Sequence, residues 1–153
     1  MCGGNGPATI TIYVSRIGNS TNLSLKQGTS APGQPGDPGG DDLETEVVAS
    51  QPIEWKINPN PDPGRKNDIT LEHVKAADAN TPKFANSQQL LENAVYAAVN
   101  EVVTAKVKAS PPPPGRGQGP NEKSFESYQI GFYLNSDPTK SEIWDDPKLR
   151  MNN

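Results

Sequence analysis

Short segments in which every second residue is apolar constrain the fold of this chain more than any other feature. The clearest lies near the end, where residues 125–134 read Phe-Glu-Ser-Tyr-Gln-Ile-Gly-Phe-Tyr-Leu. Successive side chains of a β-strand point to opposite faces, so this alternation predicts a strand with one buried face. A turn-rich gap follows, and Asp146-Pro147 then opens a short final strand that contains Leu149 and Met151.

The same alternation recurs along the chain and predicts seven or eight short strands separated by turns. Trp55 shares one face of its strand with Ile53 and Ile57, and we expect it at the centre of the core. Many short strands with turn signals between them indicate an all-β fold, a single antiparallel β-sandwich of immunoglobulin-like or jelly-roll topology. The expected strands are 9–14, 23–25, 46–48, 53–57, 69–74, a strand within 102–109, 128–134 and the segment around 149–151.

Residues 87–99 fit two patterns. Asn86 or Ser87 resembles a helix N-cap, and several of the apolar residues that follow fit a helical stripe. From Val99 onward the apolar residues fit a period of two instead. The sequence therefore predicts a short helix or an irregular turn to about Ala94, followed by a strand.

Two Pro/Gly-rich segments, 28–42 and 110–124, are expected to form long loops. Segments with so few large apolar residues cannot offset the entropy lost on ordering. The length of 153 residues indicates one domain spanning 1–153, with a flexible amino terminus at 1–7.

The charge and the single cysteine limit the partners and the compartment. The net charge of −4, with scattered basic residues, gives no reason to expect nucleic acid. No apolar stretch is long enough to span a membrane as a helix, and no signal sequence is evident. Cys2 cannot form an intramolecular disulfide. The chain is expected in the cytoplasm, or at the surface or in the periplasm if Cys2 is a lipidated residue.

Several short motifs together resemble small bacterial β-sandwich proteins, the inclusion-body family typified by PixA and AidA and the related DP-EP proteins. The resemblance covers about two-thirds of the chain; both Pro/Gly-rich loops and the segment Leu90–Ala98 depart from it. It implies a β-sandwich and a link to abundant, self-associating bacterial proteins, and it carries no catalytic residues. The matching residues are Ile53, Trp55, Ile69, Leu71, Tyr128, Ile130 and Asp146-Pro147-Lys148-Leu149-Arg150-Met151-Asn152.

Catalysis is poorly supported by the residues present. His73 is the only histidine, and the sequence contains no Gly-x-Ser-x-Gly nucleophile motif. Paired carboxylates could serve glycoside hydrolysis, but Glu54, Glu72 and Glu126 are expected on the solvated faces of their strands. We therefore predict a non-enzymatic protein with no catalytic residues and no cofactor, apart from calcium as considered next.

One His and one Cys cannot supply a structural zinc site or a blue-copper site within one chain. Calcium is less easily dismissed, because Asp37, Asp41 and Asp42 lie together in a Gly-rich loop and hard cations bind carboxylate oxygens. Acidic residues are also common in turns for conformational reasons. These three residues are the predicted calcium ligands.

Tyr13 and Tyr133 lie opposite the apolar faces of their strands, and Trp144 lies just before the last strand. These three aromatic residues are predicted to mark a contact surface. The leading hypothesis is a bacterial structural or interaction protein that forms a homo-oligomer or larger assembly through sheet edges or loop surfaces. A different protein partner is one alternative. Another is a calcium- or carbohydrate-binding module that uses the Asp37–Asp42 loop and Trp144, and that is lipid-anchored at the surface if Cys2 is a lipidated residue.

Overall fold

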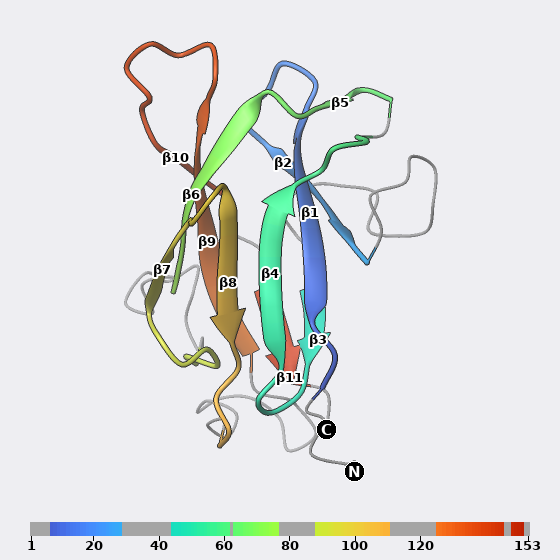
Figure 1. The fold of residues 1–153 in the computed structure, drawn as a ribbon, viewed down its shortest axis with the longest axis vertical. Helices are drawn as coiled ribbons and strands as arrows, with labels where there is room; N and C mark the ends of the chain where they lie inside the picture. Colours follow the sequence, from blue (N-terminus) through green and yellow to red (C-terminus); the bar gives the residue numbers. More distant parts are fainter. Residues whose placement is uncertain are drawn as a thin grey trace.

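Two β-sheets and no helix make up the described part of the chain (Figure 1). The structure is a computed structural model that describes residues 7–28, 44–61, 63–76, 88–110, 125–145 and 148–151. The expected all-β class is confirmed. The predicted residues Cys2, Asp37, Asp41 and Asp42 and nearly all of both predicted long loops lie outside the described residues.

The first sheet has five strands, and the second has six. In the five-stranded sheet, in spatial order, lie β2 (Leu23–Gln27), β1 (Ile10–Ile17), β4 (Pro52–Ile57) and β8 (Val102–Lys106), with β5 (Arg65–Lys66) paired to β1. In the six-stranded sheet lie β3 (Glu44–Val47), β11 (Lys148–Met151), β9 (Phe125–Leu134), β6 (Ile69–Ala76) and β7 (Val95–Ala97), with β10 (Ile143–Asp145) paired to β9.

All eight predicted strands have a counterpart in the structure. The described residues nevertheless contain eleven strands, because β5, β7 and β10 are short strands of two or three residues that were not predicted. Strands of this length carry too few residues for an alternation to be visible in the sequence.

Two pairings correct the expectation of a purely antiparallel fold. β1 and β4 are parallel, with Ile10 opposite Ile53, and β11 and β3 are also parallel, with Met151 opposite Val47. Between β2 and β4 the chain visits the other sheet to form β3, so β4 returns beside β1 without a hairpin. Crossover connections of this kind allow parallel neighbours.

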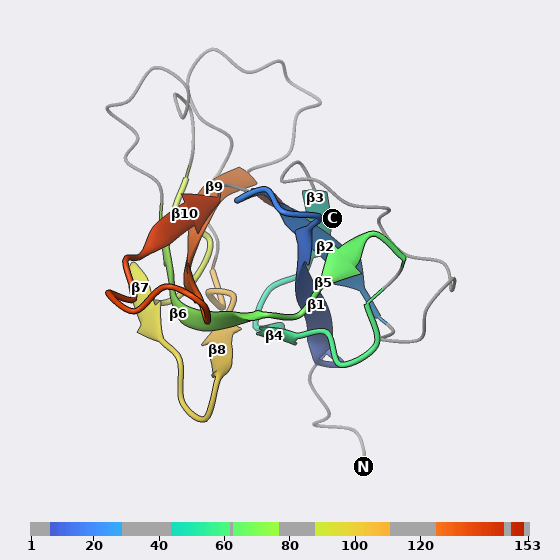
Figure 2. The same cartoon turned by 90° about the horizontal axis from the view of Figure 1, so that it is seen from above.

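The two sheets face each other, as the view from above shows (Figure 2). Buried apolar side chains from both sheets form one hydrophobic core. Trp55 on β4 is fully buried in this core, as predicted. Its indole Nε1 donates a hydrogen bond of 3.2 Å to the hydroxyl oxygen of Tyr128 on β9, and the two rings lie 5.4 Å apart. The expected core centre is therefore a contact between the sheets.

Residues 88–94 form an irregular turn, so the irregular-turn alternative is confirmed and the helix is wrong. Leu90 and Leu91 are both buried although they are consecutive. The chain then forms β7, turns through Asn100 and Glu101, which both have positive φ, and enters β8. Two such residues in a row fit a tight hairpin turn.

Candidate functional site

A β-bulge in β6 turns two polar side chains to the solvent side of the six-stranded sheet. Leu71 pairs with Phe132 and His73 pairs with Gly131, so Glu72 is the extra residue between them. Leu71 and Val74 are both buried, which shows that the alternation changes phase within the bulge. Glu72 and His73 are consequently both half-buried on the outer side.

Gly131 on β9 provides the space in which this site forms. It pairs with His73 on one side and with Trp144 of β10 on the other. A Cβ atom at this position would lie only 2.8 Å from the Trp144 ring and would collide with the Glu142 carboxylate. The absence of a side chain at Gly131 therefore allows the indole and the carboxylate to lie close against the strand.

We call Glu72, His73, Lys75, Glu142 and Trp144 the outer-face cluster. The Nδ1 atom of His73 lies 2.7 Å from Oε2 of Glu142, and the His73 ring stacks on Trp144 with centroids 6.3 Å apart. The ammonium of Lys75 lies 4.1 Å from the centroid of the Trp144 ring, a cation–π contact. This cluster draws its residues from β6, from β10 and from the turn before β10.

Within the described residues, Glu72, His73 and Glu142 are the three side chains that could hold a metal ion. Their donor atoms lie within 4.8 Å of one another. Ligands of one tetrahedral zinc ion are about 3.4 Å apart, so a shared ion would require side-chain movement. The hydrogen bond between His73 and Glu142 and the contact of the Lys75 ammonium with the Trp144 ring are better explained as a polar surface cluster.

The structure brings two of the three predicted contact residues to one sheet and places the third on the other. Trp144 and Tyr133 lie on the outer face of the six-stranded sheet, where Lys140 contacts the Tyr133 ring. Tyr13 lies on β1 of the five-stranded sheet, half-buried beside Lys56. The three aromatic residues therefore do not form one patch.

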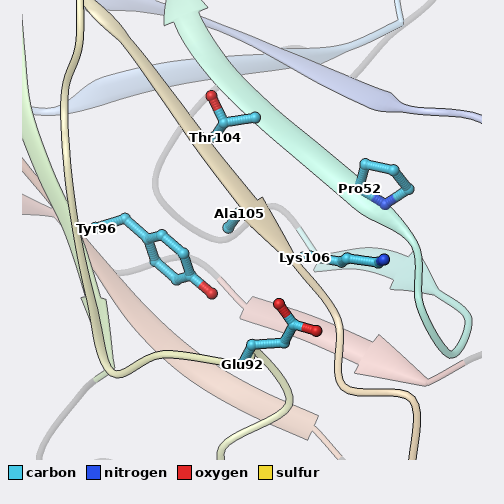
Figure 3. Close-up of a pocket in the computed structure, with 6 residues that line it drawn as sticks. All are labelled: Pro52, Glu92, Tyr96, Thr104, Ala105 and Lys106. Carbon is cyan, nitrogen blue, oxygen red and sulfur yellow. The ribbon is translucent and has the colours of Figure 1, made fainter.

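A hollow of about 340 Å³ lies where β7 and β8 diverge below their connecting turn (Figure 3). Glu92 and Lys106 bring opposite charges to this hollow, so their fields largely cancel and give no net attraction for an ion. The lining residues are Pro52, Glu92, Tyr96, Thr104, Ala105 and Lys106. Its volume is near the lower end for small-molecule sites.

Glu126 corrects the expectation that it lies on a solvated face, because it is only 1% exposed. It shares the inward face of β9 with Tyr128, Ile130 and Phe132, and the alternation in the sequence already contains this signal. Its Oε1 accepts hydrogen bonds from the backbone N–H groups of Leu90 and Leu91, at 2.7 and 3.1 Å. The second oxygen, Oε2, is buried and has no hydrogen-bond partner.

Burial raises the pKa of Glu126 to about 7. The two backbone N–H groups and the charge of Lys108 act in the opposite direction, because they stabilise the carboxylate. Desolvation dominates, so this carboxyl group changes charge near neutral pH.

Comparison with protein-family models and with curated proteins finds no match to this chain. The part of the chain that the structure describes has no helix long and apolar enough to cross a membrane.

Proposed function

We propose that this chain is a non-enzymatic interaction protein that associates with further copies of itself through β7 and the turn that follows it. The observation that carries this proposal is the exposure of two valines, Val95 at 56% and Val99 at 70%. They are the exposed large hydrophobic residues among the described residues. Burying such side chains against a second copy would release water from apolar surface.

The backbone of β7 supports the same proposal. Ala94 and Ala98 use their main-chain groups to bond Ala76 and Glu72 of β6. Main-chain groups of successive strand residues point to alternate edges, so the N–H and C=O groups of Val95 and Ala97 point away from β6. Unpaired edge groups of this kind can pair with a strand of another chain.

The composition of β7 also favours self-association. The strand reads Val95-Tyr96-Ala97 and carries no charge, so two copies related by a two-fold axis meet without repulsion. Natural edges are commonly protected by charged residues or by proline, and β7 has neither. Its shortness limits the contact area, and we expect a weak, concentration-dependent association.

The proposal is tested by measuring mass in solution over a wide concentration range, by light scattering or sedimentation equilibrium. The wild-type protein should rise above the monomer mass of 16.4 kDa as concentration increases. The variant Val95→Lys should stay near the monomer mass, because a charge on an apolar contact opposes burial. A protein that remains a strict monomer at millimolar concentration would contradict the proposal.

Two further variants separate the edge from the surface around it. Ala97→Pro removes a main-chain donor that points away from β6, and the bonds of β7 to β6 are retained. It should weaken association if strand pairing contributes. Thr21→Lys adds the same charge at an exposed position in the turn between β1 and β2, outside β7 and its following turn, and should associate like the wild-type protein.

We further infer that the two sheets form a single β-sandwich, with an immunoglobulin-like or jelly-roll connection modified by the two parallel pairs. The resemblance to the inclusion-body family supports both this fold and self-association. The calcium ligands Asp37, Asp41 and Asp42 and the lipidation of Cys2 stay predictions. For carbohydrate binding the geometry is less favourable, because Lys75 and His73 already pack on the Trp144 ring.

A further inference from the structure

Residues 90–92 close the gap between the two sheets on the side of β8. On one side the main chain pairs with β8 and the residues after it: Glu92 N–H donates to Lys106 at 2.9 Å, and Lys108 N–H donates to Leu90 at 2.8 Å. On the other side Leu90 and Leu91 donate to the Glu126 carboxylate of β9. We call this arrangement the β8–β9 seam.

One buried side chain therefore holds this seam from the side of the six-stranded sheet. Leu90 and Leu91 are fully or almost fully buried, so the segment also adds two large side chains to the core. Opening of residues 88–92 would expose both leucines to water, together with main-chain groups at the outer edge of β8. It would also bring the Glu126 carboxyl group into contact with water.

The charge state of Glu126 determines the free energy required to open residues 88–92. Only one of its two oxygens has partners, and a charged carboxylate with an orphaned buried oxygen is expensive to keep away from water. The N–H groups of Leu91 and Leu90 favour the charged form, but burial outweighs them. Lys108 also favours the charged form, and the ring hydroxyl of Tyr128 on β9 lies within range of the Glu126 charge. The neutral acid avoids most of the desolvation cost.

We propose that Glu126 acts as a pH-sensitive latch, which holds residues 88–92 across the β8–β9 seam at mildly acidic pH and releases them as the pH rises. The geometry fixes the direction, because the carboxyl group is buried when the seam is closed and hydrated when it is open. Release of residues 88–92 exposes the side chains of Leu90 and Leu91 and the outer edge of β8, which lies beside β7. The device goes beyond the proposed self-association and is measurable in the monomer.

Amide hydrogen exchange of the full chain, followed by NMR at pH 5 and pH 8, tests the latch. The amides of Leu90, Leu91, Glu92 and Lys108 should open more at the higher pH, by on the order of 50-fold after correction for intrinsic exchange. The amide of Ser20 is an internal reference, because it bonds the carbonyl oxygen of Ile17 within the turn between β1 and β2 and can open without unfolding of the core. Its opening should stay nearly constant.

The variant Glu126→Gln retains a side-chain carbonyl for both N–H groups but cannot change charge, so it should remove the pH dependence at the four amides. Glu46→Gln, an exposed change on β3, should leave the wild-type dependence intact. Equal pH dependence in the wild-type protein and in Glu126→Gln would overturn the latch.

A second measurement keeps the test decisive if Glu126→Gln does not fold. Carbon-13 NMR of the carboxyl groups in the wild-type protein reports the titration of Glu126 directly. A midpoint near neutrality supports the latch. A midpoint near 4.5, the ordinary value for glutamate, overturns it.

Discussion

The two sheets are joined at the β8–β9 seam and also where β10 meets β2, which we call the β2–β10 seam. At both seams a buried carboxylate accepts a hydrogen bond from the backbone, but its surroundings differ. At the β8–β9 seam, Glu126 accepts the main-chain N–H groups of Leu90 and Leu91. At the β2–β10 seam, Oδ2 of Asp145 on β10 accepts a hydrogen bond of 2.8 Å from the backbone N–H of Leu23 on β2. In both cases a buried carboxylate of the six-stranded sheet binds the backbone of a core leucine.

The two seams differ in what surrounds the carboxylate. Asp145 takes part in a further interaction besides its bond to Leu23, whereas Oε2 of Glu126 has no hydrogen-bond partner. In addition, Leu23 lies in a regular strand that is paired with β1, but Leu90 and Leu91 lie in an irregular turn. Strand pairing therefore fixes Leu23 at one seam, whereas at the β8–β9 seam the Glu126 side chain bonds an irregular turn to the six-stranded sheet.

The largest expected effect is the pH dependence of stability. The folded protein holds the Glu126 proton up to about pH 7, whereas the unfolded chain releases it near 4.5. The folded state thus binds more protons between these values, and the free energy of unfolding should fall as pH rises through this window, by about 2–3 kcal/mol from pH 5 to pH 8. Urea denaturation at a fixed low protein concentration measures this change.

Other carboxyl groups act in a lower pH range. Hydrogen bonding to Arg16 lowers the pKa of Asp68, and hydrogen bonding to Thr139 lowers that of Asp137. Their stabilising contributions are largely complete above about pH 5, because that lies above the ordinary aspartate value. Glu126→Gln should therefore flatten the curve between pH 5 and pH 8. Stability that rises across this range in the wild-type protein would contradict the assignment.

The next effect tests the other seam. Asp145→Ala leaves the buried N–H of Leu23 without its acceptor and should lower the free energy of unfolding by about 1–3 kcal/mol. Asp137→Ala is the matched control, because Asp137 is half-exposed and bonds only within its own turn at Thr139 and Ser141. Urea denaturation of both variants at pH 6 compares them. Equal losses would mean that the Leu23 contact does not hold the seam.

The smallest effect is expected at Glu142, a carboxylate outside both seams. Its side chain is 26% exposed and that of His73 is 38% exposed, so their interaction is partly screened by water. Glu142→Gln can still bond His73 and should change the unfolding free energy by less than about 1 kcal/mol. A loss as large as that of Asp145→Ala would show that burial does not explain the difference between these carboxylates.

Alternation in the sequence predicted the strands that pack on the core, because burial on one face leaves a period of two. Ile12, Val14 and Trp55 lie inside, as this pattern requires. The parallel pairing of β1 with β4 could not be predicted in this way, since alternation shows which face is buried and not which strand is the neighbour. Short strands such as β7 were missed for lack of length.

The candidate sites were harder to predict, because each depends on a local break in a regular pattern. The bulge that exposes Glu72 and His73 has no marker in the sequence beyond a histidine in an apolar position of the alternation. The consecutive apolar residues Leu90 and Leu91 fitted a helical stripe in the sequence. In the structure both are buried in an irregular turn between the two sheets. The prediction of a solvated Glu126 was wrong and could have been avoided, because the alternation in β9 places Glu126 on the same inner face as Tyr128.

The two tryptophans of this chain lie in separate environments, one on each sheet. Trp55 is sealed in the core against Tyr128, whereas Trp144 packs on the outer face between His73 and Lys75. The protein thus contains two built-in optical reporters: the fluorescence of Trp55 follows contact between the sheets, and that of Trp144 follows the outer-face cluster. Replacing Trp144 by Phe leaves a single indole that reports only whether the two halves of the core stay together.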